Sequence, residues 1–159
     1  WPFRDPHNLT QEMHEVQRGM SRFVAGTWAC GFDWLNFSPQ PIDEGMQVTS
    51  RTPGAAGEVP LLPFGCSDGT HSLIWLLRDK RVAEHDAPIA PADLLVPSPH
   101  ESTYIAEFWE TYSGERLGEY HLEVTNSPSI HLPLPAFGTD IAITLRPANS
   151  VPLEANYQE

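Results

Sequence analysis

Basic residues are scarce in this 159-residue chain, and the shortage excludes two classes of partner. Nine Lys and Arg stand against 21 Asp and Glu, which gives a formal net charge of -12. Nucleic acids and anionic membrane surfaces are bound by basic stripes, so the charge argues against both. An acidic surface suits a neutral or cationic ligand, or serves solubility alone.

Long apolar runs and cysteines are also in short supply. No run approaches the roughly 20 residues of a membrane-spanning helix, and the first ten residues lack the pattern of a signal peptide. The chain begins at Trp1 instead of Met, so we expect a piece of a longer protein or a processed product. Cys30 and Cys66, the two cysteines, could form one disulfide or remain as buried thiols.

An amphipathic helix is predicted near the N-terminus, because apolar residues recur three and four positions apart from Thr10 onward. The helix would be capped by Asn8 or Thr10 and end between Gly26 and Gly31. The apolar residues would form a stripe along one side of the helix, which must be buried against the rest of the chain or against a domain that this chain lacks. It comprises Met13, Val16, Met20, Phe23, Val24 and the pair Thr27–Trp28.

The remainder predicts a mainly β fold, an antiparallel β-sandwich with an N-terminal amphipathic α-helix. Short alternating segments are separated by turn residues every ~8–12 positions. We divide the chain into a loop, helix and connector (1–36), the sandwich (37–147) and a tail (148–159). Strands are predicted at about 46–50, 94–96, 102–112, 116–125, 128–134 and 139–146, and on both sides of the turn Ser67–Thr70.

Carboxylates and histidines lack the spacing of a catalytic or metal site. Glu107 and Glu119 are polar positions of alternating strands, so we expect both to face water and identify no complete catalytic carboxylate pair. His121 and His131 could face each other across adjacent strands, but two ligands make a poor metal site. We therefore predict no metal and no cofactor, and the catalytic residues stay unknown.

Aromatic rings are the remaining candidates, since flat rings stack on the apolar faces of sugars. Trp109 and Tyr112 lie near the turn of the hairpin, and with Tyr104 they would form a platform if the three rings share an exposed face. Trp75 is expected to fill the core instead. It lies in the apolar run Leu73–Leu77, which is typical of a central strand covered on both faces.

The segments AEFWETYSGERLGEYHLEV and IHLPLPAFGTDIAITLRP resemble the closing β-domain of bacterial glycoside hydrolases with a (β/α)8-barrel catalytic domain. The resemblance rests on four motifs: Trp109–Glu110 (Asp is more usual than Glu), Thr111–Gly114, Leu117–Glu119 and Phe137–Ile143. Residues 1–24 are similar to the end of the last barrel strand, the loop after it and the final barrel helix.

The resemblance implies an accessory role, in which a C-terminal β-sandwich stabilises a catalytic barrel and contacts glycan. Both catalytic glutamates would lie before Trp1, and Trp1 itself would line the sugar-binding cleft. The candidate carbohydrate-binding residues are Trp1, Trp109 and Tyr112. Expected partners are a polysaccharide or oligosaccharide, and a (β/α)8 barrel or a second copy of the chain. The compartment is left open by the residues, and the resemblance alone implies an extracellular or periplasmic one.

Two other functions stay open at this point. A free-standing carbohydrate-binding module would use the rings of Trp109, Tyr112 and Tyr104, and burial of those rings would exclude it. A small polysaccharide-active enzyme would use an acidic pair or a metal bound by His121 and His131. In either case the helix stripe would have to dock on the sandwich or on a second copy.

Overall fold

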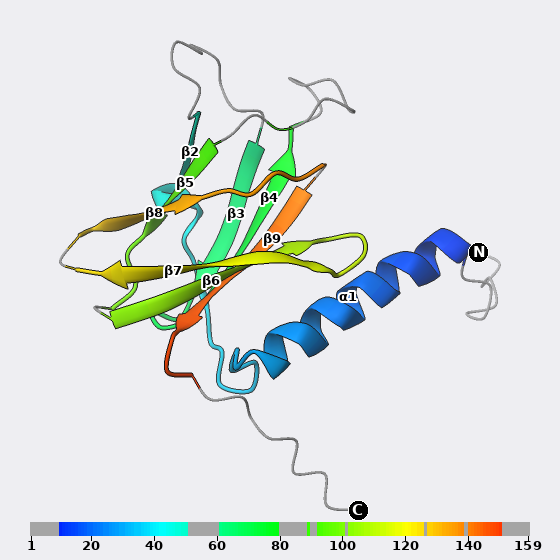
Figure 1. The fold of residues 1–159 in the computed structure, drawn as a ribbon, viewed down its shortest axis with the longest axis horizontal. Helices are drawn as coiled ribbons and strands as arrows, with labels where there is room; N and C mark the ends of the chain where they lie inside the picture. The colour runs from blue at the N-terminus through cyan, green and yellow to red at the C-terminus, as the bar shows by residue number, and fades with distance from the viewer. Residues whose placement is uncertain are drawn as a thin grey trace, which may run out of the picture.

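The computed structural model contains a helix and two antiparallel sheets that pack face to face (Figure 1). The structure describes residues 10–50, 61–79, 89, 92–100, 102–125, 127–138 and 140–150. Its elements are α1 (Gln11–Ala29), β1 (Gln40–Pro41), the 3-10 turn η1 (Asp43–Gly45), β2 (Gln47–Ser50), β3 (Leu61–Ser67), β4 (Ser72–Arg78), β5 (Ala92–Pro97), β6 (Ser102–Glu110), β7 (Arg116–Val124), β8 (Ser129–Pro133) and β9 (Asp140–Pro147). The predicted fold class is confirmed.

Helix α1 begins and ends where its capping residues predict. The hydroxyl oxygen of Thr10 accepts a hydrogen bond from the amide of Met13 at 3.2 Å, which satisfies one of the free amides of the first turn. Gly31 follows the end of the helix with a φ of 92°, a conformation that favours glycine. The helix is too polar to cross a membrane.

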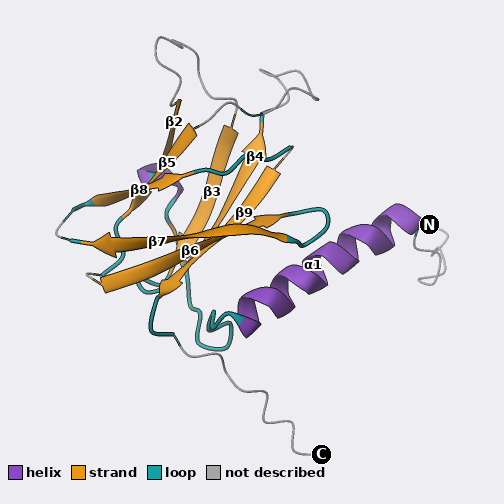
Figure 2. Ribbon diagram, in the orientation of Figure 1, coloured by secondary structure: helices purple, strands orange, loops and turns teal. Residues whose placement is uncertain are grey.

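The larger sheet has the strand order β1-β3-β4-β9-β6-β7, and the smaller one has the order β2-β5-β8 (Figure 2). The β3–β4 hairpin closes through Asp68, whose carboxylate accepts the amides of Thr70 and His71, and through Gly69 with a φ of 88°. Strands β7 and β8 belong to different sheets. The expectation that His121 and His131 face each other across adjacent strands is therefore wrong.

The core lies between the two sheets and is built by period-two alternation. The large sheet contributes Ile74, Ile143 and Leu145, and the small sheet contributes Leu94 and Leu132, all with no exposed surface. In the strands of the large sheet, the alternate residues point to the face that lies away from the small sheet, which we call the outer face. Helix α1 packs on this outer face.

The outer face is covered only in part, and here one prediction is wrong. The apolar run of β4 was expected to be covered on both faces, yet Leu77 is 38% exposed and Trp75 is half-buried. The physical reason is the position of α1, whose contacts centre on Trp109 of β6 and Ala142 of β9. Leu73 and Trp75 of β4 pack against the edge of this cluster, whereas Leu77 and Phe64 of β3 stay exposed.

Candidate functional site

Helix α1 lies along strand β6 in the antiparallel sense. A methyl group added at Gly19 would overlap the carbonyl oxygen of Tyr112, and one added at Gly26 would overlap the indole of Trp109. Further along the helix axis, the thiol of Cys30 reaches the carboxylate of Glu107. Residues later in the helix therefore contact residues earlier in the β6 segment, as an antiparallel arrangement requires. The two glycines are needed because they let the helix backbone approach the strand closely.

Aromatic side chains fix the C-terminal half of α1 to the sheet. The ring of Phe23 meets Trp109 edge to face, with 5.7 Å between ring centroids, and meets Trp34 in the same way at 6.2 Å. The indole of Trp34 donates a hydrogen bond to the hydroxyl of Thr27 at 2.9 Å. The connector after the helix therefore folds back over the outer face, and Phe32 of this connector is fully buried.

Glu107 occupies the centre of this covered region, and its burial corrects the expectation that it faces water. The side chain has no exposed surface, because α1 and the connector cover the part of the outer face on which it lies. Its carboxylate is 3.0 Å from Arg116 and 3.4 Å from Arg146, and accepts a hydrogen bond from Thr144 at 3.4 Å. We call these four residues the Glu107 clamp. It links β6, β7 and β9.

Cys30 and Cys66 are both free thiols. Burial raises the pKa of the Cys30 thiol, and the neighbouring carboxylate of Glu107 raises it further. Burial also raises the pKa of Cys66. A nucleophilic cysteine needs a lowered pKa, so the surroundings of both thiols argue for a structural role.

The acidic pair that a small enzyme would need is not set up for proton transfer. Glu107 and Glu119 lie directly opposite each other on β6 and β7, but Arg116 bridges the two carboxylates. Hydrogen bonding from His121 holds the pKa of Glu119 below its usual range, and the charge of Arg116 lowers it as well. A general acid for glycoside hydrolysis needs a raised pKa instead. Among the described residues, no three His, Cys, Asp or Glu side chains gather to hold a metal.

The three rings proposed for sugar stacking do not share an exposed face. Trp109 is buried beneath Phe23, and Tyr104 is buried in the core between the sheets. Tyr112 is half exposed, and its hydroxyl donates a hydrogen bond to Glu15 of α1. Trp1 lies outside the described residues. The platform on which the module hypothesis depends is therefore absent.

The hairpin turn that receives α1 is held by Glu110. Its carboxylate accepts the amides of Tyr112 at 3.1 Å and Ser113 at 2.6 Å, and Gly114 completes the turn with a φ of 69°. Burial would raise the pKa of Glu110, but the hydrogen bonds from Ser113 and Tyr112 outweigh it and the pKa lies below its usual range. Glu110 thus caps the turn with both of its carboxylate oxygens.

We expect Glu110→Gln to lower the free energy of unfolding by about 1 kcal/mol at pH 7, because the neutral amide is a weaker acceptor. A lowered pKa contributes stability that is present above the unfolded value, about 4.3, and is lost as the pH falls through the folded value. Urea titrations between pH 7 and 3 should therefore show the difference between the two proteins shrinking below pH ~4.3. A difference that stays constant over this range would contradict the role of the charge.

The remaining apolar residues of α1 form a stripe with no partner in the described structure. Of the predicted stripe, Phe23 is buried against the sheet, and Thr27 is buried and accepts a hydrogen bond from Trp34 of the connector. The others stay accessible, with Met13, Val16 and Met20 about half exposed and Val24 39% exposed. We call Met13, Val16, Met20 and Val24 the free stripe. The arrangement offers a surface for docking rather than a chemical centre.

No protein-family model and no curated protein matches the chain. Among solved structures, the crystal structure of the GH39 enzyme from Xanthomonas axonopodis pv. citri matches with a TM-score of 0.41 and 9% sequence identity. The match covers 54% of this chain and 26% of that chain, so it corresponds to about a quarter of the length of the GH39 enzyme. A likeness at this level identifies no family.

Proposed function

We propose that this chain is the accessory C-terminal part of a glycoside hydrolase and that it stabilises a (β/α)8 catalytic barrel. The observation that carries the proposal is the free stripe of α1. Helix α1 packs on the sandwich through Gly19, Phe23 and Gly26 and keeps a second apolar side exposed, as expected of a helix that lies between two domains. Residues 1–24 resemble the end of a barrel, including its final helix, so we propose that the second domain is the (β/α)8 barrel.

Apolar exposure of this extent supports a stable interface. Four large side chains along one side of a helix, each 39–50% exposed, are unusual for an isolated soluble surface. A barrel carries its helices on the outside of its strands, so its last helix has one side on the barrel and one side outward. In the proposed assembly the outward side is the one that holds the sandwich. Trp1 and Tyr112 stay predictions for glycan contact.

The coding sequence upstream of Trp1 gives the first test. The proposal expects an open frame that encodes a barrel with two catalytic glutamates at the ends of its strands. A frame that starts near Trp1 would refute the proposal directly. The same expression work should show that residues 1–159 alone do not hydrolyse aryl glycosides, while the barrel joined to them does.

A substitution in the free stripe tests the interface itself. With the barrel and residues 1–159 produced as separate chains, Met20→Glu is expected to weaken their association about 100-fold, because the change buries an unpaired carboxylate. His14→Glu adds the same charge on another side of α1 and should leave the affinity within about threefold. Isothermal titration calorimetry measures both. Equal affinities for the two variants would rule out the free stripe as the contact.

A further inference from the structure

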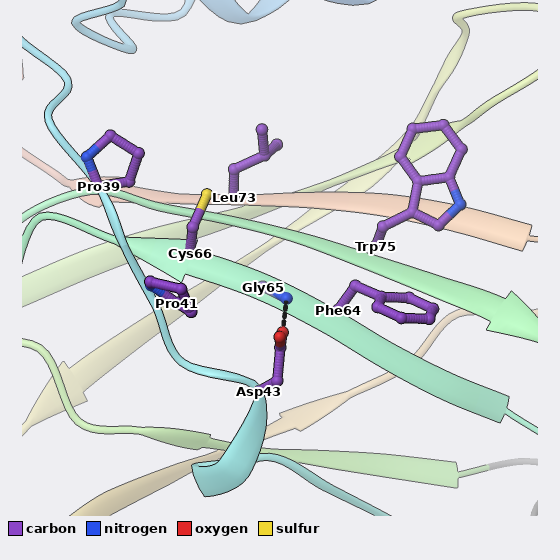
Figure 3. A pocket seen from close by; sticks show the side chains of 8 residues that line it. All are labelled: Pro39, Pro41, Asp43, Phe64, Gly65, Cys66, Leu73 and Trp75. Carbon is purple, nitrogen blue, oxygen red and sulfur yellow. Dashed lines mark hydrogen bonds between the residues drawn. The ribbon is translucent and has the colours of Figure 1, made fainter.

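The edges of the two sheets differ in their protection against pairing with another strand. At one edge of the large sheet, β1 has only two residues, and the chain that follows it stays bound to β3. Figure 3 shows this region, in which the carboxylate of Asp43 accepts the amide of Gly65. In the small sheet, β2 has four residues, and β8 has five and ends at Pro133. Short strands and proline are common means of protecting a sheet edge.

Strand β7, at the other edge of the large sheet, lacks both means. It is nine residues long, contains no proline, and pairs with β6 alone. Its alternate N–H and C=O groups point away from β6, and none of them has a backbone partner in the part of the chain that the structure describes. Leu117 and Tyr120 of this strand are 40% and 41% exposed. An unpaired edge of this length is a template for another strand.

The charges of β7 limit how a second copy of this strand could pair with it. Two copies that pair in the antiparallel sense about a two-fold axis must have the axis at a residue, because paired side chains point to the same face. An axis at Glu119 would place two identical carboxylates opposite each other. An axis at His121 would place Glu119 opposite the partner's Glu123. Like charges directly opposite each other are destabilising, so neither register is favoured.

An axis at Tyr120, the middle residue of β7, gives complementary pairs instead. Glu119 then lies opposite the partner's His121, and symmetry repeats the pair on the other side of the axis. Both side chains are accessible, with exposed fractions of 43% and 59%. On the other face, Gly118 lies opposite the partner's Leu122. A Cβ atom added at Gly118 would meet nothing within 4 Å, so the leucine has room there.

A bulge at the start of β7 extends the complementarity. Leu117 is the extra residue of the bulge, which turns Arg116 to the outer face, where it binds Glu119. Glu123 lies on the same face near the other end of the strand, because residues 118–124 alternate regularly. Pairing about Tyr120 therefore brings Glu123 toward the partner's Arg116. An axis at either neighbour of the same face, residue 118 or 122, would leave four of the nine residues of β7 unpaired.

The net charge of -12 opposes association of two copies at long range. At physiological ionic strength, however, charges more than about 8 Å apart are largely screened, so the contacts at the edge decide the outcome. A single pair of strands buries a small area, and interfaces below about 1,200 Å² are weak. The expected dissociation constant is therefore on the order of 100 μM.

We infer that β7 is a self-association edge, through which two copies of this chain pair in the antiparallel sense about Tyr120. The two large sheets would then form one continuous sheet across the two-fold axis. A second copy is the partner because β7 is complementary in charge and in size to itself in this register. The inference goes beyond the proposed function and does not depend on a barrel.

Sedimentation of residues 1–159 between about 10 μM and 1 mM tests the association. We expect a monomer–dimer equilibrium, and His121→Glu should weaken it about tenfold or more, because Glu119 would then face a carboxylate. His131→Glu is the matched control. It adds the same charge at an exposed position of β8 and should leave the dissociation constant within about threefold. Exchange of the two residues, Glu119→His with His121→Glu, should restore association.

A disulfide tests the register. Directly opposite residues of antiparallel strands have Cα atoms about 4.5–5.5 Å apart, which is within the range of a disulfide. Oxidation of Tyr120→Cys with oxidised glutathione should therefore join two copies through residue 120, as identified by mass spectrometry of the linked peptides. Glu123→Cys, which lies away from the axis, should give far less of its own symmetric disulfide.

Three results would overturn the inference. The first is a monomer over the whole concentration range. The second is a dimer that His121→Glu and His131→Glu weaken equally. The third is a dimer that Met20→Glu weakens and His121→Glu does not, which would place the contact on the free stripe of α1. The first two leave the proposed function standing, since it depends on the free stripe and not on β7.

Discussion

Replacing Glu107 by Leu is expected to lower the free energy of unfolding by about 3 kcal/mol. The carboxylate has no exposed surface and joins Arg116, Arg146 and Thr144. Without it, the guanidinium of Arg146, which is 9% exposed, stays buried beside an apolar side chain. Breaking a buried ion pair from one side costs more than the pair itself contributes, because the remaining charge is left uncompensated.

The matched control for this prediction is Glu119→Leu. Glu119 binds the same Arg116 but is 43% exposed, and an exposed ion pair contributes about 0–1 kcal/mol. Urea unfolding at pH 7 followed by tryptophan fluorescence measures both variants. If Glu107→Leu is no less stable than Glu119→Leu, the Glu107 clamp does not stabilise the fold.

Gly19→Ala is expected to destabilise the protein by about 2 kcal/mol, although alanine is the better helix former by about 1 kcal/mol. The added methyl group would overlap the backbone carbonyl of Tyr112, and a backbone atom cannot move aside as the end of a side chain can. The helix would have to lift from the hairpin turn, where Gly114 also approaches it.

Gly118→Ala on β7 is the control, because an alanine methyl group there would meet nothing within 4 Å. We expect its effect to stay within about 0.5 kcal/mol. Hydrogen exchange of the α1 amides should increase in Gly19→Ala and not in Gly118→Ala. A stability gain in Gly19→Ala would mean that the close contact between helix and hairpin is not formed in solution.

Local signals in the sequence were sufficient for α1 and most of the strands, whereas β1 and η1 were not predicted. Thr10 and Gly31 mark the ends of α1, Asp68–Gly69 closes the β3–β4 hairpin, and Gly114 closes the next one. Each of these residues acts on its own neighbours in the chain, so its role can be recognised without knowing the rest of the structure.

The candidate site depended on contacts between distant segments, and there the sequence was less informative. Alternation placed Glu107 on the outer face correctly, but it does not reveal that a helix 80 or so residues earlier covers that face. Trp109 was proposed as an exposed ring for the same reason. Which residues of the α1 stripe are buried and which stay exposed also depends on where the sheet lies. The periodicity of the helix gives no information on the position of the sheet.

The strand residues on which α1 packs are added by the ribosome long after the helix itself. The helix appears first, while Trp109 and Ala142, on which Phe23 rests, follow about 85 and 120 residues afterwards. At about 5–20 residues per second, the helix waits roughly 6–24 s for its place on the sandwich. In the proposed assembly, a barrel made before the helix would already be present during that interval. The helix would then pack against the barrel through its free stripe first, and the sandwich would pack against Phe23 only after β9 is made.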